Sequence, residues 1–299
     1  MIFKGVDFWP HKRIFPVMGL RKYFLFLTIG LALLSVIELF ILGLNFGIDF
    51  KGGSLFEVRS SKAEISIPDL KRRMNALDLG DVQVQEIQSL NATSKNEALI
   101  RIEQQPGGEK VQQEVVVKVR EALKGTGIEI RRQEVVGAAV SAELKQAGLI
   151  AVICAMIGIM LYVWFRFEWQ FGVAAILALV HDVFITLGLF SLLGLEFNLS
   201  IVAALLTLAG YSINDTVVVF DRIRENLRKY KKMPLEELLN LSINETLSRT
   251  VITSVTTFFA VLALFIFGTE AIRGFSFAML FGIVIGTWSS IFIASPFLL

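Results

Sequence analysis

Six apolar stretches, each long enough to cross a lipid bilayer, constrain the fold of this chain more than any other feature. About 20 consecutive apolar residues span the hydrocarbon core, and hydrophobic residues make up 54% of the sequence. A bilayer offers no water to backbone N–H and C=O groups, so such stretches form helices. The sequence therefore predicts a polytopic α-helical membrane protein with six transmembrane helices, at residues 23–44, 149–165, 171–193, 199–220, 250–267 and 275–298.

Basic residues gather at one end of these spans. Lys4, Lys12, Arg13, Arg21 and Lys22 precede the first span, while Arg222, Arg224, Arg228, Lys229, Lys231 and Lys232 follow the fourth. By the positive-inside rule both chain termini are cytoplasmic, residues 1–22 form a cytoplasmic N-terminus and residues 221–249 form a cytoplasmic basic loop. Topology and lipid headgroups explain a basic stretch in this place, and no nucleic acid is expected as a partner.

The segment between the first two spans is long enough to form a separate domain on the far side of the membrane. Residues 45–143 alternate between strand and helix patterns. The patterns predict strands at 54–59, 82–87, 98–103 and 128–136 and helices at 66–77 and 107–123. The order βαββαβ is typical of the ferredoxin-like α+β fold. The single cysteine, Cys154, lies in a span, so this domain depends on its own core and not on an intrachain disulfide.

An acidic residue interrupts the fourth span. Asp215 lies within an otherwise apolar run, where a charge costs at least about 2.5 kcal/mol on insertion scales. Thr207, Tyr211 and Asp215 recur every four residues, so they share one helix face, and Ser212 and Asn214 adjoin it. The pattern predicts that this face turns toward the interior of the bundle.

Polar residues also follow helical spacing in two other spans. In the fifth, Arg249 is followed four residues later by Thr253, and in the third, Asp182 is followed by Thr186 and preceded by His181. Exposure of polar side chains to lipid is unfavourable, so we expect the helices to pack with these polar faces toward one another. His181 is interpreted as a packed, hydrogen-bonded residue, and Asp182 as a residue that supports His181.

The pairing of Asp215 with Arg249 allows two interpretations. An ion pair in low dielectric favours both charged forms and can tie two helices together without ever titrating. Alternatively, movement of Arg249 toward or away from Asp215 releases or captures a proton, which would let a proton gradient drive a change of shape. The sequence leaves both open.

Residue types required for other chemistry are missing. The glycine-rich segment 47–53 lacks the lysine that a phosphate-binding loop requires. With two histidines and one cysteine, no spaced ligand cluster and no Cys/His nucleophile pair can form. No enzymatic activity, no cofactor and no metal site is predicted.

Four segments of the sequence together match a family pattern. They are Gly47–Gly53 after the first span, Val136-Gly137 with Glu143-Leu144 before the second, Val180–Asp182 in the third and Gly210–Asn226 across the fourth. This set resembles the SecF family of protein-export membrane proteins. The last segment is long and specific, and the resemblance covers nearly the whole chain.

The resemblance implies a multi-pass protein of the bacterial inner membrane with its sheet domain in the periplasm. It implies three partners. The first is SecD, which is a related six-span protein, and the others are the SecYEG channel and a translocating polypeptide. The SecD and SecF pair would use the proton-motive force, after an ATP-driven motor, to promote late translocation. Asp215 is then the proton carrier, Arg249 the coupled arginine and Asp182 a further acidic position.

Two alternative functions fit the same residues. One is half of a proton-driven exporter of small molecules or lipids of the resistance-nodulation-division type, which would share the intramembrane acid. The other is a non-transporting subunit that stabilises a translocon. The second would not need a titratable Asp215, so replacement by Asn separates it from the transport functions.

Overall fold

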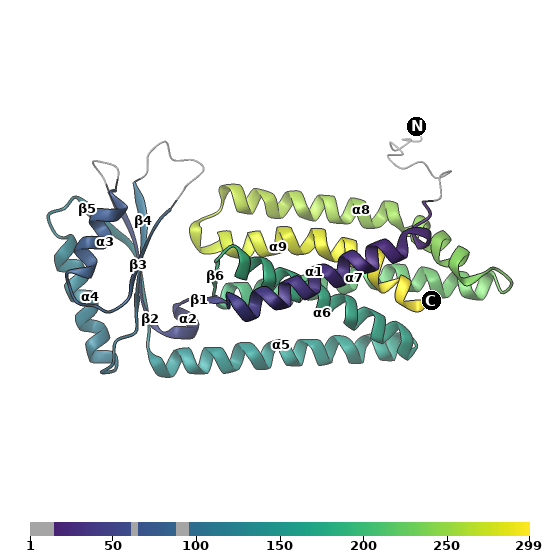
Figure 1. Cartoon of the computed structure of the whole chain (residues 1–299), viewed down its shortest axis with the longest axis horizontal. Coiled ribbons are helices and arrows are strands. Elements are labelled where there is room, and N and C mark those ends of the chain that lie inside the picture. The colour runs from purple at the N-terminus through teal and green to yellow at the C-terminus, as the bar shows by residue number, and fades with distance from the viewer. Residues whose placement is uncertain (1–14, 61–64, 88–95) are drawn as a thin grey trace, which may run out of the picture.

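The protein is elongated, with a bundle of long helices that carries a small sheet domain at one end (Figure 1). The computed structural model describes residues 15–60, 65–87 and 96–299. Lys4, Lys12 and Arg13, which contribute to the predicted orientation, lie outside the described residues.

Six helices of the described chain are long and apolar enough to cross a membrane, which confirms the predicted number of spans. They are α1 (Arg21–Ile41), α5 (Ala138–Arg166), α6 (Trp169–Leu192), α7 (Leu199–Lys229), α8 (Leu235–Phe267) and α9 (Glu270–Ser289). The last of these continues through a π-helical turn, Ser290–Ala294, and a 3-10 turn, Pro296–Leu298.

The helices α7 and α8 extend well beyond the apolar spans. Most of the segment 221–249, for which a loop is predicted, is helical, and only residues 230–234 separate the two helices. Arg222 joins them, with Nε 2.8 Å from Glu245 Oε2, and Asn226 Nδ2 donates to the same oxygen at 2.7 Å. Hydropathy detects the apolar part of a helix and does not show where the helix ends. The polar extensions of α7 and α8 therefore cannot be recognised from hydropathy.

The small sheet domain contains strands and helices at the predicted places in the chain. They are β2 (Gly53–Ser60), α3 (Ile67–Asn75), β3 (Val82–Glu86), β4 (Glu97–Glu103), α4 (Glu109–Leu123) and β5 (Ile128–Val136). Ser66 caps α3, since its side chain accepts a hydrogen bond from the backbone N–H of Asp69.

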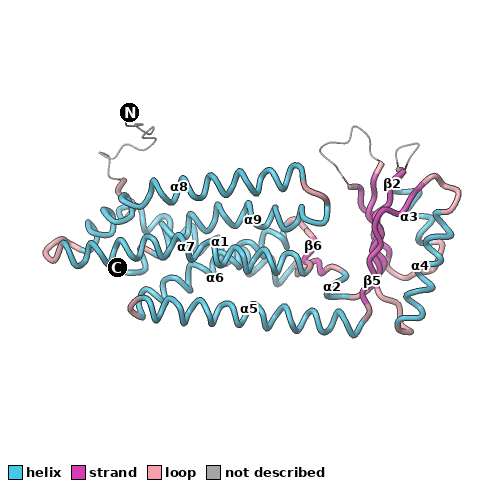
Figure 2. Tube along the Cα trace, turned by 180° about the vertical axis from the view of Figure 1, so that it is seen from behind, coloured by secondary structure: helices cyan, strands magenta, loops and turns pink. Residues whose placement is uncertain are grey.

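The four strands form one antiparallel sheet in the order β3-β4-β2-β5. The helices α3 and α4 cover the face of the sheet that points away from the bundle, and the open face points toward it (Figures 1 and 2). Phe56, Val58, Ile100 and Ile102 form the centre of the core beneath the helices, all without exposed surface.

A short glycine-containing connection joins the bundle to the sheet. Strand β1 (Asn45–Phe46) pairs in parallel with β6 (Glu196–Phe197), which lies between α6 and α7, and the single turn α2 (Ile48–Lys51) follows. Gly53 has φ of 126°, and a Cβ there would lie 2.3 Å from the carbonyl oxygen of Ile102. Glycine at this position lets β2 begin directly beside β4.

The bundle has three central and three peripheral helices. About half of the apolar window of α6, α7 and α9 is buried, against 11% for α1 and α5 and 17% for α8. Gly282 and Gly286 of α9 lie against α7, where added Cβ atoms would meet Leu208 Cδ2 at 2.5 Å and Ser212 Cβ at 3.2 Å. The two glycines therefore allow α9 to approach α7 closely, as a GxxxG spacing does in membrane helices.

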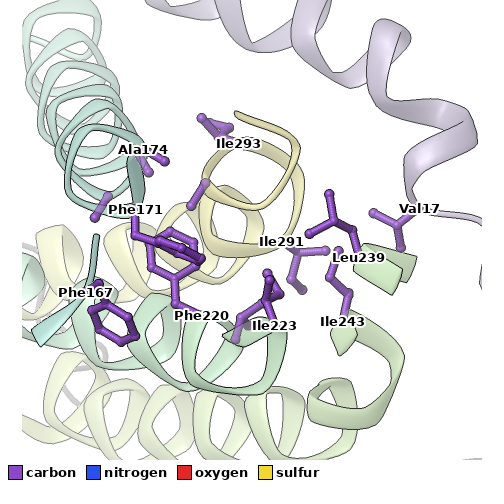
Figure 3. Packing of buried hydrophobic residues seen from close by; sticks show 14 of the residues in the cluster. Val17, Phe167, Phe171, Ala174, Phe220, Ile223, Leu239, Ile243, Ile291 and Ile293 are labelled. Carbon is purple, nitrogen blue, oxygen red and sulfur yellow. The ribbon is translucent and has the colours of Figure 1, made fainter. Parts of the chain in front are cut away.

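An aromatic cluster fixes the end of the bundle that lies farthest from the sheet. Phe167 and Phe171, on either side of the start of α6, pack against Phe220 of α7, with centroid separations of 5.9 and 5.0 Å (Figure 3). Ile223 and Ile243 continue this buried cluster into α8. The turn between α5 and α6 is thereby held against α7.

Candidate functional site

The carboxylate of Asp215 is buried among the helices α7, α8 and α9. Only 3% of the residue is exposed. Ser254 of α8 donates a hydrogen bond from Oγ to Asp215 Oδ2 at 3.4 Å, and its Oγ lies 2.7 Å from Thr287 Oγ1 of α9. Tyr211 donates from its hydroxyl to Ser254 Oγ at 3.2 Å. Asp215 is thus reached by a chain of hydroxyl groups from three helices and held by one long hydrogen bond.

A second buried carboxylate, Asp182, lies deeper between α6, α7 and α9. It has no exposed surface. Both Ser212 of α7 and Ser289 of α9 donate to Asp182 Oδ2 at 2.7 Å, and His181 Nδ1 lies 3.0 Å from Oδ1. His181 and Asp182 are therefore in direct contact, as a supporting role of Asp182 requires. Asp182 is held much more firmly than Asp215.

Arg249 lies on an exposed part of α8. Among the described residues no salt bridge joins Arg249 to Asp215, since every such pair within 4.0 Å involves other side chains. Thr253 Oγ1 bonds the carbonyl oxygens of Arg249 and Thr250 at 3.0 and 2.9 Å. A static ion pair that ties α7 to α8 is not formed in this structure.

The predicted polar face of α7 divides into an inner and an outer part. Tyr211 is half-buried, Ser212 and Asp215 are buried, and Thr207 and Asn214 are exposed. A step of four residues turns an α-helix by about 40° beyond a full circle, so residues 207 and 215 are about 80° apart around the axis. Residues four apart thus drift from the outer surface into the bundle.

Three hydroxyl residues of this site were not singled out by sequence reasoning. Ser254, Thr287 and Ser289 contact the two carboxylates directly or through one further hydroxyl. Serine and threonine are common in membrane helices and can bond the carbonyl oxygen one turn earlier, as Thr287 also does with Ile283 at 2.7 Å. Their type alone does not indicate which of them faces an acid. Their position opposite Asp182 and Asp215 requires the packing of α8 and α9.

The N-terminal end of α7 is tied to the sheet domain and to its connection by two contacts. Asp49 of α2 accepts a hydrogen bond from the backbone N–H of Leu199, the first residue of α7, at 2.9 Å. Arg101 of β4 forms a salt bridge with Glu196, three residues before α7. Burial raises the pKa of Glu196 above its ordinary value of 4.5, although the Arg101 guanidinium opposes the rise. The helix that carries Asp215 therefore begins at the junction with the sheet domain.

Comparison with known proteins agrees with this arrangement. The family described as "Protein export membrane protein SecD/SecF, C-terminal" matches residues 116–299, and the "SecD/SecF GG Motif" matches residues 39–64. The protein translocase subunit SecF of Cereibacter sphaeroides is 46% identical over 268 residues, which cover 89% of this chain and 82% of the relative. The protein translocase subunit SecDF of Brucella abortus is 44% identical over 95% of this chain and 36% of its own length.

A solved structure has the same fold. The crystal structure of SecDF from Thermus thermophilus, described as a translocon-associated membrane protein, superposes with a TM-score of 0.85 at 37% identity. The match covers 97% of this chain and 39% of the SecDF chain, so this chain spans about two fifths of that larger protein. On the family match to more than half of its residues and on its identity to full-length relatives, the chain belongs to the SecF family of protein-export membrane proteins.

Proposed function

We propose that this chain is a Sec protein-export subunit that, with SecD, uses the proton-motive force to promote late translocation of polypeptides across the inner membrane. The observation that carries the proposal is the buried carboxyl group of Asp215 in a membrane helix, without a salt bridge to any described residue. A charge in this setting is costly unless it is paired. The group therefore has a physical reason to change its protonation state during a transport cycle.

The surroundings support different roles for the two aspartates. Asp215 accepts one long hydrogen bond from Ser254, whereas Asp182 is held by two short ones and by His181. We assign Asp215 as the proton carrier and Asp182 as a more firmly anchored acidic member of the site. Arg249, on the neighbouring helix and free of a salt bridge to Asp215, is the coupled cation whose movement would release or capture the proton.

The element order and strand order of the outer domain support a ferredoxin-like fold. In its sheet the first strand, β2, lies between β4 and β5. Helix α3 connects β2 to β3 along the chain, and β4 lies between these two strands in the sheet. This is the arrangement of a split βαβ fold. We place this domain in the periplasm and both chain termini in the cytoplasm, because the basic residues gather at the opposite end of the bundle.

The outer face of α7 supports a membrane partner. Ala203, Thr207, Gly210 and Asn214 are all exposed on this helix. Small and polar residues of this kind are enriched where membrane helices pack against each other and not where they face lipid. SecD is the proposed occupant, since the Brucella relative and the solved structure are SecDF proteins. The SecYEG channel and the translocating polypeptide are the further proposed partners, in a transport role without catalysis.

The proposal is tested by gradient-dependent completion of preprotein translocation in inverted membrane vesicles. Asp215→Asn keeps size and hydrogen bonding but removes the charge. We expect the gradient-dependent step to disappear while ATP-driven entry persists, at matched SecD and SecF levels. Asp78→Asn is the matched control, because Asp78 is exposed and its φ of 53° suits asparagine equally well.

Each other result points to an alternative function. If both steps persist in Asp215→Asn and efflux of small molecules or lipids is also unchanged, the chain is a non-transporting assembly subunit and the proton role is wrong. If translocation is normal in the variant but efflux of small molecules or lipids is lost, the chain acts as half of an exporter.

A further inference from the structure

We infer that a basic pocket at the end of the bundle farthest from the sheet binds the phosphate headgroup of an anionic phospholipid. The pocket has a volume of about 410 Å³ and is lined by Arg166, Asp221, Arg224, Glu225, Arg228 and Lys229. One wall is the C-terminal end of α5, and the other is the last two turns of α7. None of these residues belongs to the polar site around Asp182 and Asp215.

The charges in this pocket do not balance. Four of the six lining residues are cations and two are acids, and each acid already has a partner. Asp221 Oδ1 lies 2.7 Å from Arg166 Nη2, and Glu225 Oε2 lies 2.7 Å from Arg222, which is not part of the lining. Arg228 forms no salt bridge with any described residue, and Lys229 lies over the ring of Tyr230 with Nζ 4.9 Å from the centroid. The lining therefore carries a net positive charge, which favours an anion.

The pocket is preorganised. Arg224 Nη1 donates to the backbone oxygen of Arg166 at 3.2 Å, which ties α7 to the end of α5. The Arg166 guanidinium lies 5.0 Å from the centroid of the Phe167 ring. Phe167, which follows Arg166 in the chain, packs with Phe171 against Phe220 in a buried contact (Figure 3). A headgroup therefore meets arginines whose backbone positions are already set.

The location of the pocket favours a lipid over a soluble or macromolecular anion. Only Phe167 and Glu168 separate α5 from α6, so this tight turn between two spans lies at the membrane surface. Trp164 and Trp169 are 62% and 64% exposed beside it, as expected of aromatic residues at headgroup level. Clustered cations between membrane helices at this depth attract anionic lipid headgroups. A phosphate there would sit between Arg224, Arg228 and Lys229, with its acyl chains along the exposed side of α5.

The test compares lipid binding by the purified full chain in mild detergent. Phosphatidylglycerol and phosphatidylcholine with the same acyl chains are titrated, and the bound lipid is counted by mass spectrometry of the intact protein. We expect preferential retention of phosphatidylglycerol by the unchanged chain. The double variant R228Q/K229Q should bind it roughly 25-fold more weakly, since each cation near the surface contributes about a factor of five.

The double variant K231Q/K232Q is the matched control, because it removes the same charge from exposed residues just outside the pocket. The charge-conserving variant R228K/K229R should bind as the unchanged chain does, which excludes a general folding defect. Equal binding of the two lipids, or equal loss in the pocket and control variants, would overturn the inference. Full competition by inorganic phosphate would also overturn it, because the pocket would then take a free anion and not a lipid.

Discussion

Arg101 and Glu196, 95 residues apart in the sequence, form a salt bridge between the sheet domain and the connection from α6 to α7. Arg101 lies on the open face of the sheet and is 8% exposed. Asp49, Glu134 and Glu270 add negative charge around Glu196. One cation thus faces several acids at the point where the sheet domain meets the start of α7, the helix that carries Asp215.

The stability of this junction should depend on the charge of Glu196. Because burial raises its pKa in the folded chain, the folded state binds a proton more readily than the unfolded state. The stabilising contribution of Glu196 is therefore complete below its ordinary pKa of 4.5 and is lost as the pH rises through the raised value. Glu196→Gln lacks this dependence. Thermal unfolding of both proteins between pH 4 and 8 should show a melting temperature difference, unchanged chain minus variant, that falls with rising pH.

Arg101→Met provides the control for the salt bridge. Methionine retains much of the buried length of arginine but removes the cation that opposes the rise in the pKa of Glu196. The stabilising contribution of Glu196 should therefore be lost at higher pH than in the unchanged chain. At neutral pH the variant leaves a half-buried acid without its partner, at a cost of about 1 to 3 kcal/mol in the free energy of unfolding. A melting temperature difference that does not vary with pH would contradict the assigned pKa direction of Glu196.

Asp49 should stabilise the first turn of α7. Its carboxylate accepts the N–H of Leu199, while Asn198 accepts the N–H of Ile201 at 3.2 Å. Loss of an N-terminal acceptor costs about 1 kcal/mol. Asp49→Ala should therefore increase amide hydrogen exchange in the first turn of α7, whereas Asp49→Asn, which keeps an acceptor oxygen, should leave exchange close to that of the unchanged chain. Faster exchange confined to the sheet domain would show that Asp49 does not act on α7.

The close approach of α9 to α7 should be sensitive to one methyl group. Gly282→Ala would bring a Cβ within 2.5 Å of Leu208 Cδ2, and we expect a loss of about 1 to 3 kcal/mol in unfolding free energy in detergent. Gly210→Ala is the matched control, because no atom lies within 4 Å of a Cβ there. Alanine favours helix over glycine by about 1 kcal/mol, so the control should be neutral or stabilising. Similar losses in both variants would contradict the packing of α9 on α7.

Ser254 should contribute modestly to stability and strongly to the environment of Asp215. Ser254→Ala removes its bonds to Asp215, Tyr211 and Thr287. Hydrogen bonds between membrane helices average about 0.6 kcal/mol, so we expect a loss of about 1 kcal/mol in unfolding free energy. Because Asp215 then lacks its donor, the pH dependence of gradient-driven translocation should also shift. Ser248→Ala on the same helix is the control, and an identical pH profile in all three proteins would separate Ser254 from the proton step.

The sequence was most informative where the membrane imposes a simple rule. Six spans, the intramembrane carboxylates Asp182 and Asp215, and the order of the strands in the sheet domain all follow from hydropathy, charge cost and periodicity. These signals are local, since each depends on residues close together in the chain. The extension of α7 through Arg222 to Lys229 was missed because the stabilising contacts come from α8.

The residues that surround the candidate site depend on distant packing. Ser254 and Ser289 look like other small hydroxyl residues of membrane helices until α8 and α9 are placed against α7. Arg101 and Glu196 look like ordinary surface charges of a sheet domain and a short loop. Only the fold brings such pairs together, and the residue pattern within one segment cannot indicate contacts with a distant segment.

The continuous helix α7 gives the molecule a mechanical property. Its 31 residues extend over about 46 Å, while the hydrocarbon core of a bilayer is about 30 Å thick. Asp49 of α2 contacts one end of this helix, Asp215 lies within its apolar part, and the cations of the basic pocket lie at the other end. A small tilt of this helix within the bundle would therefore move its two ends at the same time in opposite directions, without any relay between them.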